Sequence, residues 1–245
     1  MSALREEAVK IFCDFDGTIA VQDTTDTVLR ALAGPEWEVL ERSWVEGHIS
    51  AAECMRRQVS LIQGDDEALA AVLSRIELRS GFAAFVRWCR QERLSLTIVS
   101  DGVDYMIRQV LERHGLGDLP VYSNSMRGGP GARVLDQPWS TSGCQNRSGV
   151  CKCRVAQSGE RGPLVYIGDG RSDFCIAEHA DLLFARSVLS RHCVDNGLPF
   201  IAYENFSDVQ RFLFLRHQES HFSRGVEAPV RIPEDSMNAL EGVAN

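Results

Sequence analysis

The chain has 245 residues, of which 44% are hydrophobic and 24% are charged, and its formal net charge is −8. This length permits one large domain or a core domain with a smaller insertion, and the composition is that of a globular protein. The negative charge argues against a nucleic-acid surface, which usually shows a basic patch. The apolar runs are shorter than the roughly 20 residues that span a bilayer, and the first residues show no signal peptide. We therefore expect a cytoplasmic protein.

Short apolar runs alternate with amphipathic stretches along most of the chain. Residues 9–15 (VKIFCDF) form an apolar run that stops at acids and Gly17, as a buried parallel strand does. Similar runs occur at 94–100, 163–169, 181–185 and 199–203, and helical patterns occupy 81–93, 105–113 and 172–179. Strands that alternate with helices predict an α/β fold with a Rossmann-like parallel sheet.

The segment from about residue 23 to 79 interrupts this alternation, because it shows helical patterns only. Pro35 fits the first turn of one helix, Ser50 begins a capping box for the next, and Asp65 or Asp66 caps a third. An insertion of about 60 residues is much longer than an ordinary connection. We predict a helical cap at 21–80, inserted after the first strand of an α/β core made of 1–20 and 81–222. Residues 223–245 are expected to form a mobile tail.

Polar residues follow three of the predicted strands, at the sheet edge where reactive groups gather in parallel α/β folds. These residues are Asp14-Phe15-Asp16-Gly17-Thr18, Ser100-Asp101-Gly102 and Asp169-Gly170-Arg171-Ser172-Asp173. Carboxylates that meet at one point repel each other, so a cluster of Asp14, Asp16, Asp169 and Asp173 needs a cation. Mg²⁺ prefers such oxygen ligands, and Ser100 and Lys152 are candidates for holding a phosphate group.

Each of these acids alone is typical of a turn or a helix cap, and their combination points to a site. The segments DFDGTIAVQD, TIVSDG, Lys152 and YIGDGRSDFCIAEHAD resemble, in order and spacing, the four motifs of the haloacid dehalogenase superfamily of aspartate-nucleophile phosphatases. The stretches GPEWEVLERSWVEG, RSGFAAFVRWC, CKC and DLLFARSVLSRHC are similar to its phosphoserine-phosphatase-like branch with a helical cap of the C1 type. Within that branch, the chain resembles the methionine-salvage phosphatases that act on 2-hydroxy-3-keto-5-methylthiopentenyl-1-phosphate. The similarity covers about residues 9–215.

The resemblance implies a magnesium-dependent phosphatase that hydrolyses a small phosphorylated metabolite through an aspartyl-phosphate. Asp14 would attack phosphorus, and Asp16 would protonate the leaving group and then activate water. The ligands of Mg²⁺ would be Asp14, the backbone carbonyl of Asp16, and Asp169, with Asp173 steadying the water molecules on the metal. The phosphate-binding residues would be Ser100, Asp101, Gly102 and Lys152.

Asp101 departs from the phosphoserine branch, which usually shows two glycines after the serine. Asp101 either faces the substrate or turns away to cap the next helix. In the first case it would favour an ester that carries a cation, as in phosphocholine and phosphoethanolamine phosphatases. Asp23, Thr24 and Asp26 likewise either contact the leaving group or cap the helix that begins there.

The cysteines divide into two sets. Cys13, Cys89 and Cys175 fall within apolar patterns, which is typical of buried free thiols. Cys144, Cys151 and Cys153 cluster around Lys152, but a structural zinc site usually has about four ligands. The three cysteines therefore support a metal site only weakly.

Several functional alternatives stay open. The same chemistry serves phosphotransferases and, without the nucleophile, phosphate-binding regulators. Phosphoserine, phosphocholine and phosphoethanolamine are alternative substrates. A dinucleotide-binding enzyme is excluded because no Gly-x-Gly-x-x-Gly follows the first strand. Trp37, Trp44 and Met55 either line the pocket or pack the cap. We expect an enzyme without nucleic-acid or membrane partners, as a monomer or homodimer.

Overall fold

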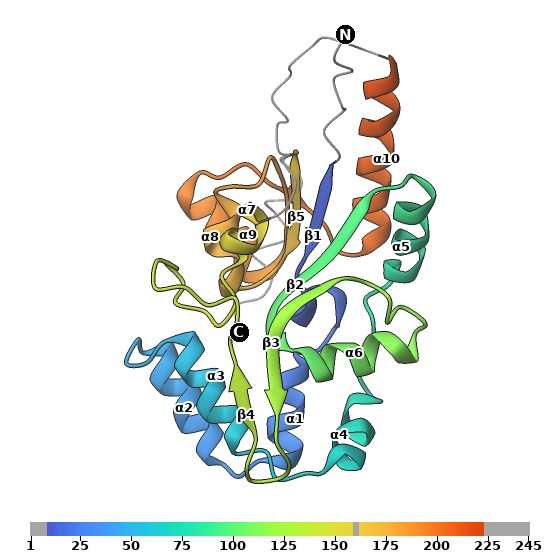
Figure 1. The fold of residues 1–245 in the computed structure, drawn as a ribbon. Coiled ribbons are helices and arrows are strands. Elements are labelled where there is room, and N and C mark those ends of the chain that lie inside the picture. Colours follow the sequence, from blue (N-terminus) through green and yellow to red (C-terminus); the bar gives the residue numbers. More distant parts are fainter. Residues whose placement is uncertain (1–8, 159–161, 223–245) are drawn as a thin grey trace, which may run out of the picture.

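The computed structural model describes residues 9–158 and 162–222. Within these ranges one sheet has the strand order β4-β3-β2-β1-β5-β6-β7 (Figure 1). The strands are β1 (Lys10–Cys13), β2 (Ser95–Val103), β3 (Val121–Arg127), β4 (Val134–Asp136), β5 (Leu164–Gly168), β6 (Leu182–Ala185) and β7 (Ile201–Ala202). β4 pairs antiparallel with β3, and the other neighbouring strands run parallel. The predicted α/β fold with a Rossmann-like parallel sheet is confirmed.

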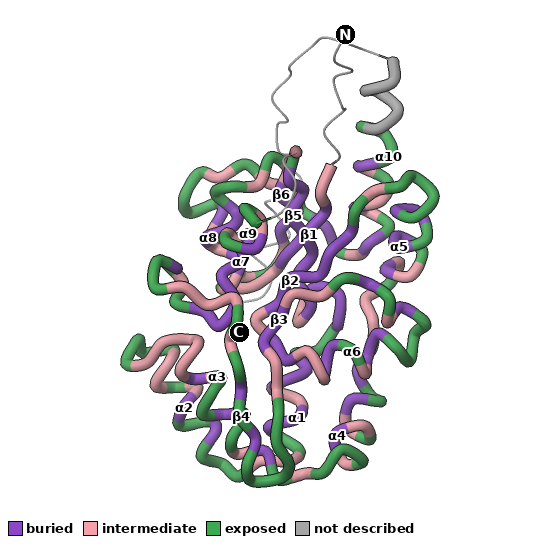
Figure 2. Tube along the Cα trace, viewed as in Figure 1, coloured by how far each residue is buried: buried purple, intermediate pink, exposed green. Residues whose placement is uncertain are grey.

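The strand β1 lies in the middle of the sheet. Asp14 and Asp16 follow it directly in the chain, so its position determines where these two acids lie. Ile11 and Cys13 pack into the core on one face, and Phe12 packs into the core on the other. Ile11, Phe12 and Cys13 are buried, as the purple part of β1 in Figure 2 shows, so both faces of the strand are covered and these residues form a continuous apolar run. Cys13 pairs with Ile98 of β2 and Ile167 of β5, so Asp14 leaves the sheet between these two strands.

Helices cover both faces of the sheet (Figure 1). The core on one face takes residues from α5 (Phe82–Gln91), α6 (Asp104–Arg113) and α10 (Phe206–Phe222). The core on the other face takes residues from α7 (Lys152–Gln157), α8 (Phe174–Ala177) and α9 (Ser187–Asn196). Phe85 and Phe206 lie with ring centroids 5.5 Å apart and join α5 to α10. Each such buried ring stabilises the fold by about 1.5–3 kcal/mol.

Four helices lie between β1 and α5 in the chain, in the segment where the sequence shows helical patterns only. They are α1 (Thr24–Leu32), α2 (Glu36–Val45), α3 (Ala51–Ser60) and α4 (Asp66–Leu73). Three begin at predicted caps, because Asp23, Ser50 and Asp65 each accept a hydrogen bond from a backbone N–H three residues later. In Figure 1 the four helices gather beyond one end of the parallel strands. Their assignment as a separate cap domain stays a prediction.

The structure contains elements that the sequence patterns did not predict. β3 and β4 form a hairpin that reaches α3, and α10 follows β7. β3 carries polar residues on an edge that is only partly covered, so it lacks a continuous apolar run. The predicted tail at 223–245 lies outside the described residues. No helix in the described ranges is both long enough and apolar enough to cross a membrane.

Candidate active site

The turn after β1 brings two carboxylates to the end of the sheet. The Asp14 N–H donates to the Ile167 carbonyl at 2.9 Å, and the next residues form one wide turn, η1 (Phe15–Ile19). Gly17 sits in this turn with φ 73°, and a Cβ atom there would lie 2.4 Å from Asp169 Oδ2. Glycine therefore meets both the left-handed conformation and the close approach of Asp169.

Asp14 is buried, with 4% of its surface exposed, and its two oxygens have different surroundings. Oδ1 accepts hydrogen bonds from Phe15 N at 2.8 Å and from Lys152 Nζ at 2.9 Å. No donor in the described ranges contacts Oδ2, and Asp14 lines a cavity of about 610 Å³. Burial and then the Asp173 charge raise the pKa of Asp14 well above its usual value, while Lys152 opposes the shift. One oxygen is thus fixed and the other is available to a ligand.

Asp16 lies between the cap-side helices and β2. Its Oδ1 accepts two hydrogen bonds from Thr24, one from N and one from Oγ1, each at 2.7 Å. Its Oδ2 approaches Gly102, where a Cβ atom would lie 2.6 Å away. Burial raises the pKa of Asp16, and the Thr24 bonds oppose that rise. A carboxyl group with a raised pKa suits a general acid.

Lys152 is completely buried at the first residue of α7 and contacts both sides of the site. Its ammonium lies 2.9 Å from Asp14 Oδ1, 2.5 Å from Asp173 Oδ1 and 3.0 Å from Ser172 Oγ. Burial disfavours the charged form, but Asp14 and Asp173 outweigh it and raise the pKa of Lys152. The lysine therefore stays positively charged beside Asp14.

Asp173 organises the neighbouring groups. Besides Lys152, its Oδ1 accepts a hydrogen bond from Tyr166 OH at 2.5 Å. Its Oδ2 accepts hydrogen bonds from the backbone N–H groups of Asp169 and Gly170, both at 2.9 Å. Both oxygens thus have two donors each, so Asp173 is better suited to positioning Lys152 and the Asp169 loop than to direct contact with a metal.

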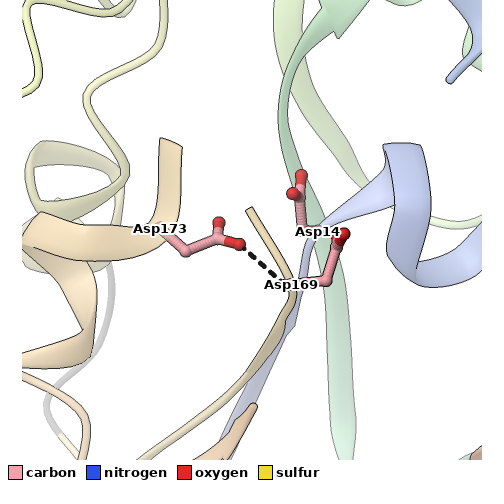
Figure 3. Close-up of side chains that lie close together, drawn as sticks. All are labelled: Asp14, Asp169 and Asp173. Atoms are coloured by element: carbon pink, nitrogen blue, oxygen red, sulfur yellow. Dashed lines mark hydrogen bonds between the residues drawn. The ribbon is translucent and has the colours of Figure 1, made fainter. Parts of the chain in front are cut away.

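Asp14, Asp169 and Asp173 offer one oxygen each within 4.8 Å of one another (Figure 3). Thr18 Oγ1 donates to Asp169 Oδ1 at 2.7 Å. Burial and the Asp173 charge raise the pKa of Asp169 to about 6. Hard oxygen donors that meet at one point fit a hard cation such as Mg²⁺. Asp14 Oδ2 and Asp169 are the carboxylates best placed to hold it.

The last part of β2, with Ser100, Asp101 and Gly102, lines the same cavity as these two carboxylates. Ser100 is buried, lines the same cavity, and accepts a hydrogen bond at Oγ from Gly102 N at 3.0 Å. Asp101 Oδ1 accepts hydrogen bonds from Val150 N at 2.9 Å and from Asn124 Nδ2 at 3.2 Å. Asp101 thereby anchors the segment that leads to Lys152.

The alternative that Asp101 caps the next helix is wrong. α6 begins at Asp104 after Val103, and no side chain caps it. Asp101 instead bonds across to the neighbouring segment while still lining the cavity, and burial raises its pKa to about 6. Contact of Asp101 with a substrate stays a prediction.

The wall opposite Asp14 comes from α1, α2 and α3. Its lining residues are Asp23, Thr25, Asp26, Glu41, Trp44, Ala51, Cys54, Met55 and Gln58. Asp23 caps α1 and also lines the cavity, and its contact with a leaving group stays a prediction. Trp44 and Met55 line the cavity, whereas Trp37 packs in the core.

Sequence reasoning missed Thr25 and Glu41. The Thr25 hydroxyl is buried and has no hydrogen-bond partner in the described ranges, and it belongs to the cavity wall. Glu41 accepts a hydrogen bond from Gln58 Nε2 at 2.9 Å. Thr25 lies in α1 and Glu41 lies in α2, and the sequence patterns of these helices do not indicate a site. Whether the two side chains point into the cavity depends on how the helices pack.

Comparisons with known proteins identify the family of the chain. The family model of the haloacid dehalogenase-like hydrolases matches residues 11–178. The 2-hydroxy-3-keto-5-methylthiopentenyl-1-phosphate phosphatase of Brevibacillus brevis is 31% identical over 214 residues, covering 85% of this chain and 96% of that protein. The protein of the same name from Geobacillus thermodenitrificans is 33% identical over 205 residues, covering 81% of this chain and 92% of that protein.

A solved structure gives the same fold. The phospho-aspartyl intermediate analogue of phosphoserine phosphatase has a TM-score of 0.60 at 18% identity, and the match covers 85% of this chain and 99% of that one. The chain therefore belongs to the haloacid dehalogenase-like hydrolase family and is a homologue of its phosphatases.

Proposed function

We propose that this chain is a magnesium-dependent phosphomonoesterase that forms an aspartyl-phosphate on Asp14. We further propose 2-hydroxy-3-keto-5-methylthiopentenyl-1-phosphate, a methionine-salvage metabolite, as its substrate. The observation that carries the proposal is the asymmetry of Asp14, whose Oδ1 is held by Lys152 and Phe15 while Oδ2 is open to the cavity. A carboxylate held in this way is oriented for attack by its free oxygen.

In the first half of the reaction, Asp14 Oδ2 attacks phosphorus and the bond from phosphorus to the ester oxygen breaks. Asp16 gives its proton to that leaving oxygen. In the second half, Asp16 takes a proton from water, the water oxygen attacks phosphorus, and Asp14 leaves as a carboxylate with release of inorganic phosphate. The raised pKa of Asp16 supports its start as the protonated acid.

Lys152 and Ser100 would hold the phosphoryl oxygens during both steps. The buried ammonium of Lys152 offsets negative charge near Asp14, and its raised pKa keeps it protonated. Mg²⁺ bound by Asp14, Asp169 and the Asp16 carbonyl would neutralise further charge on the phosphoryl group. Asp173 would keep Lys152 and the Asp169 loop in place through its four hydrogen bonds.

The names of the Brevibacillus and Geobacillus relatives support the methylthio enol-phosphate as substrate. The cavity also supports it, because apolar side chains line part of its wall next to the acids. Trp44, Met55, Phe174 and Val188 are the apolar lining residues best suited to a methylthio group. We also propose that residues 21–80 act as a cap, since α1, α2 and α3 supply the wall that faces the leaving group.

A second substrate class is favoured by the charge of the same cavity. Asp23, Asp26, Glu41 and Asp101 line it in addition to the proposed catalytic acids. Burial raises the pKa of all four, and Asp16, Asp26 and Glu41 add to the rise at Asp23. A cationic leaving group, such as the ammonium group of phosphoethanolamine or phosphocholine, would favour the charged forms of these carboxyl groups and would be attracted to them.

The test is phosphate release from a panel of the methylthio enol-phosphate, phosphoserine, phosphocholine and phosphoethanolamine, with Mg²⁺ and with a chelator. A magnesium-dependent preference for the enol-phosphate would support the first substrate. A preference for an amine ester, reduced selectively by Asp23→Asn or Asp101→Asn, would support the second. Release of no phosphate from any ester in the presence of Mg²⁺ would overturn the proposed activity.

Two controls make this test specific. Asp14→Asn keeps the size of the side chain but removes the nucleophile, and we expect loss of turnover with an unchanged circular-dichroism spectrum. Appreciable activity of that variant would contradict the aspartyl-phosphate mechanism. Adding an alcohol and looking for its phosphorylated product separates hydrolysis from phosphoryl transfer.

A further inference from the structure

Four cysteines line a second cavity, of about 330 Å³, outside the proposed active site. They are Cys144, Cys151, Cys153 and Cys175. Three are close in sequence, and the fold adds Cys175 from α8. All four are free thiols. The fourth sulfur supplies the ligand that the sequence cluster lacked for a typical zinc site.

The four thiols are close enough to affect one another's protonation. The neighbouring Cys175 lowers the pKa of Cys153, and Cys153 raises the pKa of Cys175. Burial raises the pKa of Cys151, and Cys144 and Cys175 add to that rise. Cys144, Cys151 and Cys175 are buried, while Cys153 is partly exposed. The cluster is therefore mostly buried but reachable from solvent at Cys153.

Of these four cysteines, only Cys153 packs against one of the two hydrophobic cores. Cys13, Cys89 and Cys193 belong to the two hydrophobic cores and do not line this cavity. The thiol cavity is instead shared with polar residues, namely Thr141, Gln145, Arg154, Gln157 and His179. Four thiols beside a polar cavity match the donor set of a thiophilic cation rather than that of an apolar core.

We propose that Cys144, Cys151, Cys153 and Cys175 bind one thiophilic divalent cation of the zinc type. Tetrahedral coordination with metal–sulfur bonds of about 2.3 Å places the sulfurs about 3.8 Å apart. In the described ranges only the Asp14, Asp169 and Asp173 group brings three ligand atoms within 4.8 Å of one another. Binding would therefore require the four thiols to move closer together by side-chain rotation, and each coordinating thiol would release its proton.

Three of the four cysteines lie close in the chain to two residues of the proposed active site, Lys152 and Asp173. Cys151 and Cys153 flank Lys152 in the chain, and Cys175 lies two residues after Asp173. An ion held by these thiols would tie the segment before α7 to α8. It would thereby hold the two ends of the buried Lys152–Asp173 pair, which are 2.5 Å apart.

Cobalt(II) is the probe for this site, because thiolate ligands give it a charge-transfer absorption that carboxylate ligands do not. The full chain, reduced and freed of metal, is titrated with Co²⁺ in excess Mg²⁺, which occupies the carboxylate cluster. We expect the thiolate absorption to saturate at one equivalent and to disappear when Zn²⁺ displaces the cobalt. Absence of that absorption in the unmodified chain would overturn the proposal whatever its phosphatase activity.

Variants identify the ligands. Cys144→Ser and Cys153→Ser each remove one sulfur, and each should weaken cobalt binding at least about tenfold. Cys54→Ser is the matched control, because Cys54 lines the cavity of the proposed active site. Equal cobalt affinity in Cys144→Ser, Cys153→Ser and the unmodified chain would contradict the assigned ligands. Circular dichroism checks that each variant is folded.

Discussion

The Asp16 carboxylate is held by Thr24, whose N–H and hydroxyl both donate to the same oxygen at 2.7 Å. Thr24 is the first residue of α1, and Asp23 before it caps that helix. The helix that follows the turn after β1 therefore sets the direction of the proposed general acid. A change in the position of α1 would move Asp16 relative to Asp14.

Thr24→Val removes the hydroxyl bond to Asp16 and keeps the backbone bond. A hydrogen bond to a charged group contributes about 1.5–3 kcal/mol, so we expect kcat/KM to fall roughly 10- to 100-fold. Thr24 lowers the pKa of Asp16, so its loss should move the basic limb of the pH profile to higher pH. Thr24→Ser keeps the hydroxyl and should behave like the unmodified chain. An unmoved basic limb in Thr24→Val would mean that another group is the acid.

Lys152→Met tests the buried ion pairs. The substitution leaves Asp14 and Asp173 without their shared cation, and breaking a buried pair usually costs about 3–5 kcal/mol. Urea unfolding in chelator should show a loss of this size. Arg90→Ala is the control, because Arg90 and Asp118 form an exposed pair at 2.6 Å, and such pairs contribute about 0–1 kcal/mol. Equal losses in the two variants would show that Lys152 is not the organising cation.

Gly102→Ala tests how closely β2 approaches the acid. A Cβ atom at Gly102 would lie 2.6 Å from Asp16 Oδ2 and 3.2 Å from Ser100 Oγ, so Asp16 must shift. Displacement by about 1 Å can lower a rate about 100-fold, and we expect kcat/KM to fall by 10- to 100-fold while the fold survives, measured by steady-state kinetics and circular dichroism. Gly129→Ala is the control, since its Cβ atom would meet nothing within 4 Å. Full activity of Gly102→Ala would place Asp16 outside the rate-determining chemistry.

The sequence predicted those parts of the fold whose signals are local. Continuous apolar runs identified β1 and β5, and the Asp23 and Asp65 caps marked helix starts. The polar residues of β3 carried no such run. Local sequence patterns therefore predict the buried strands and the capped helices, but they do not predict β3, which is only partly buried.

Contacts that depend on packing could not be predicted in the same way. Tyr166 lies in an apolar strand, and only the fold shows that its hydroxyl meets Asp173. The direction of Thr25 and Glu41 into the cavity depends on how α1 and α2 pack. Asp101 bonds to Val150, which lies 49 residues away in the chain, and no spacing rule indicates that contact.

The pH dependence of metal binding follows from Asp169. Its pKa is raised to about 6, whereas an unfolded aspartate has a pKa of about 3.9. Between these values the folded chain binds more protons than the unfolded chain, so stability without metal falls as pH rises from about 4 to about 6. Above that window Asp169 is charged beside Asp14 and Asp173, and a bound cation relieves the repulsion. We expect Mg²⁺ to raise Tm more at about pH 7.5 than at about pH 5.

Differential scanning calorimetry with Mg²⁺ and with chelator measures this difference at the two pH values. Asp169→Asn removes the titrating carboxylate, so its chelator-treated form should lose less stability as pH rises, and Mg²⁺ should raise its Tm much less. Asp118→Asn is the matched control, because Asp118 belongs to the exposed pair with Arg90 and should leave the Mg²⁺ effect unchanged. An equal Mg²⁺ effect at both pH values, or one that survives in Asp169→Asn, would place the metal away from this carboxylate cluster.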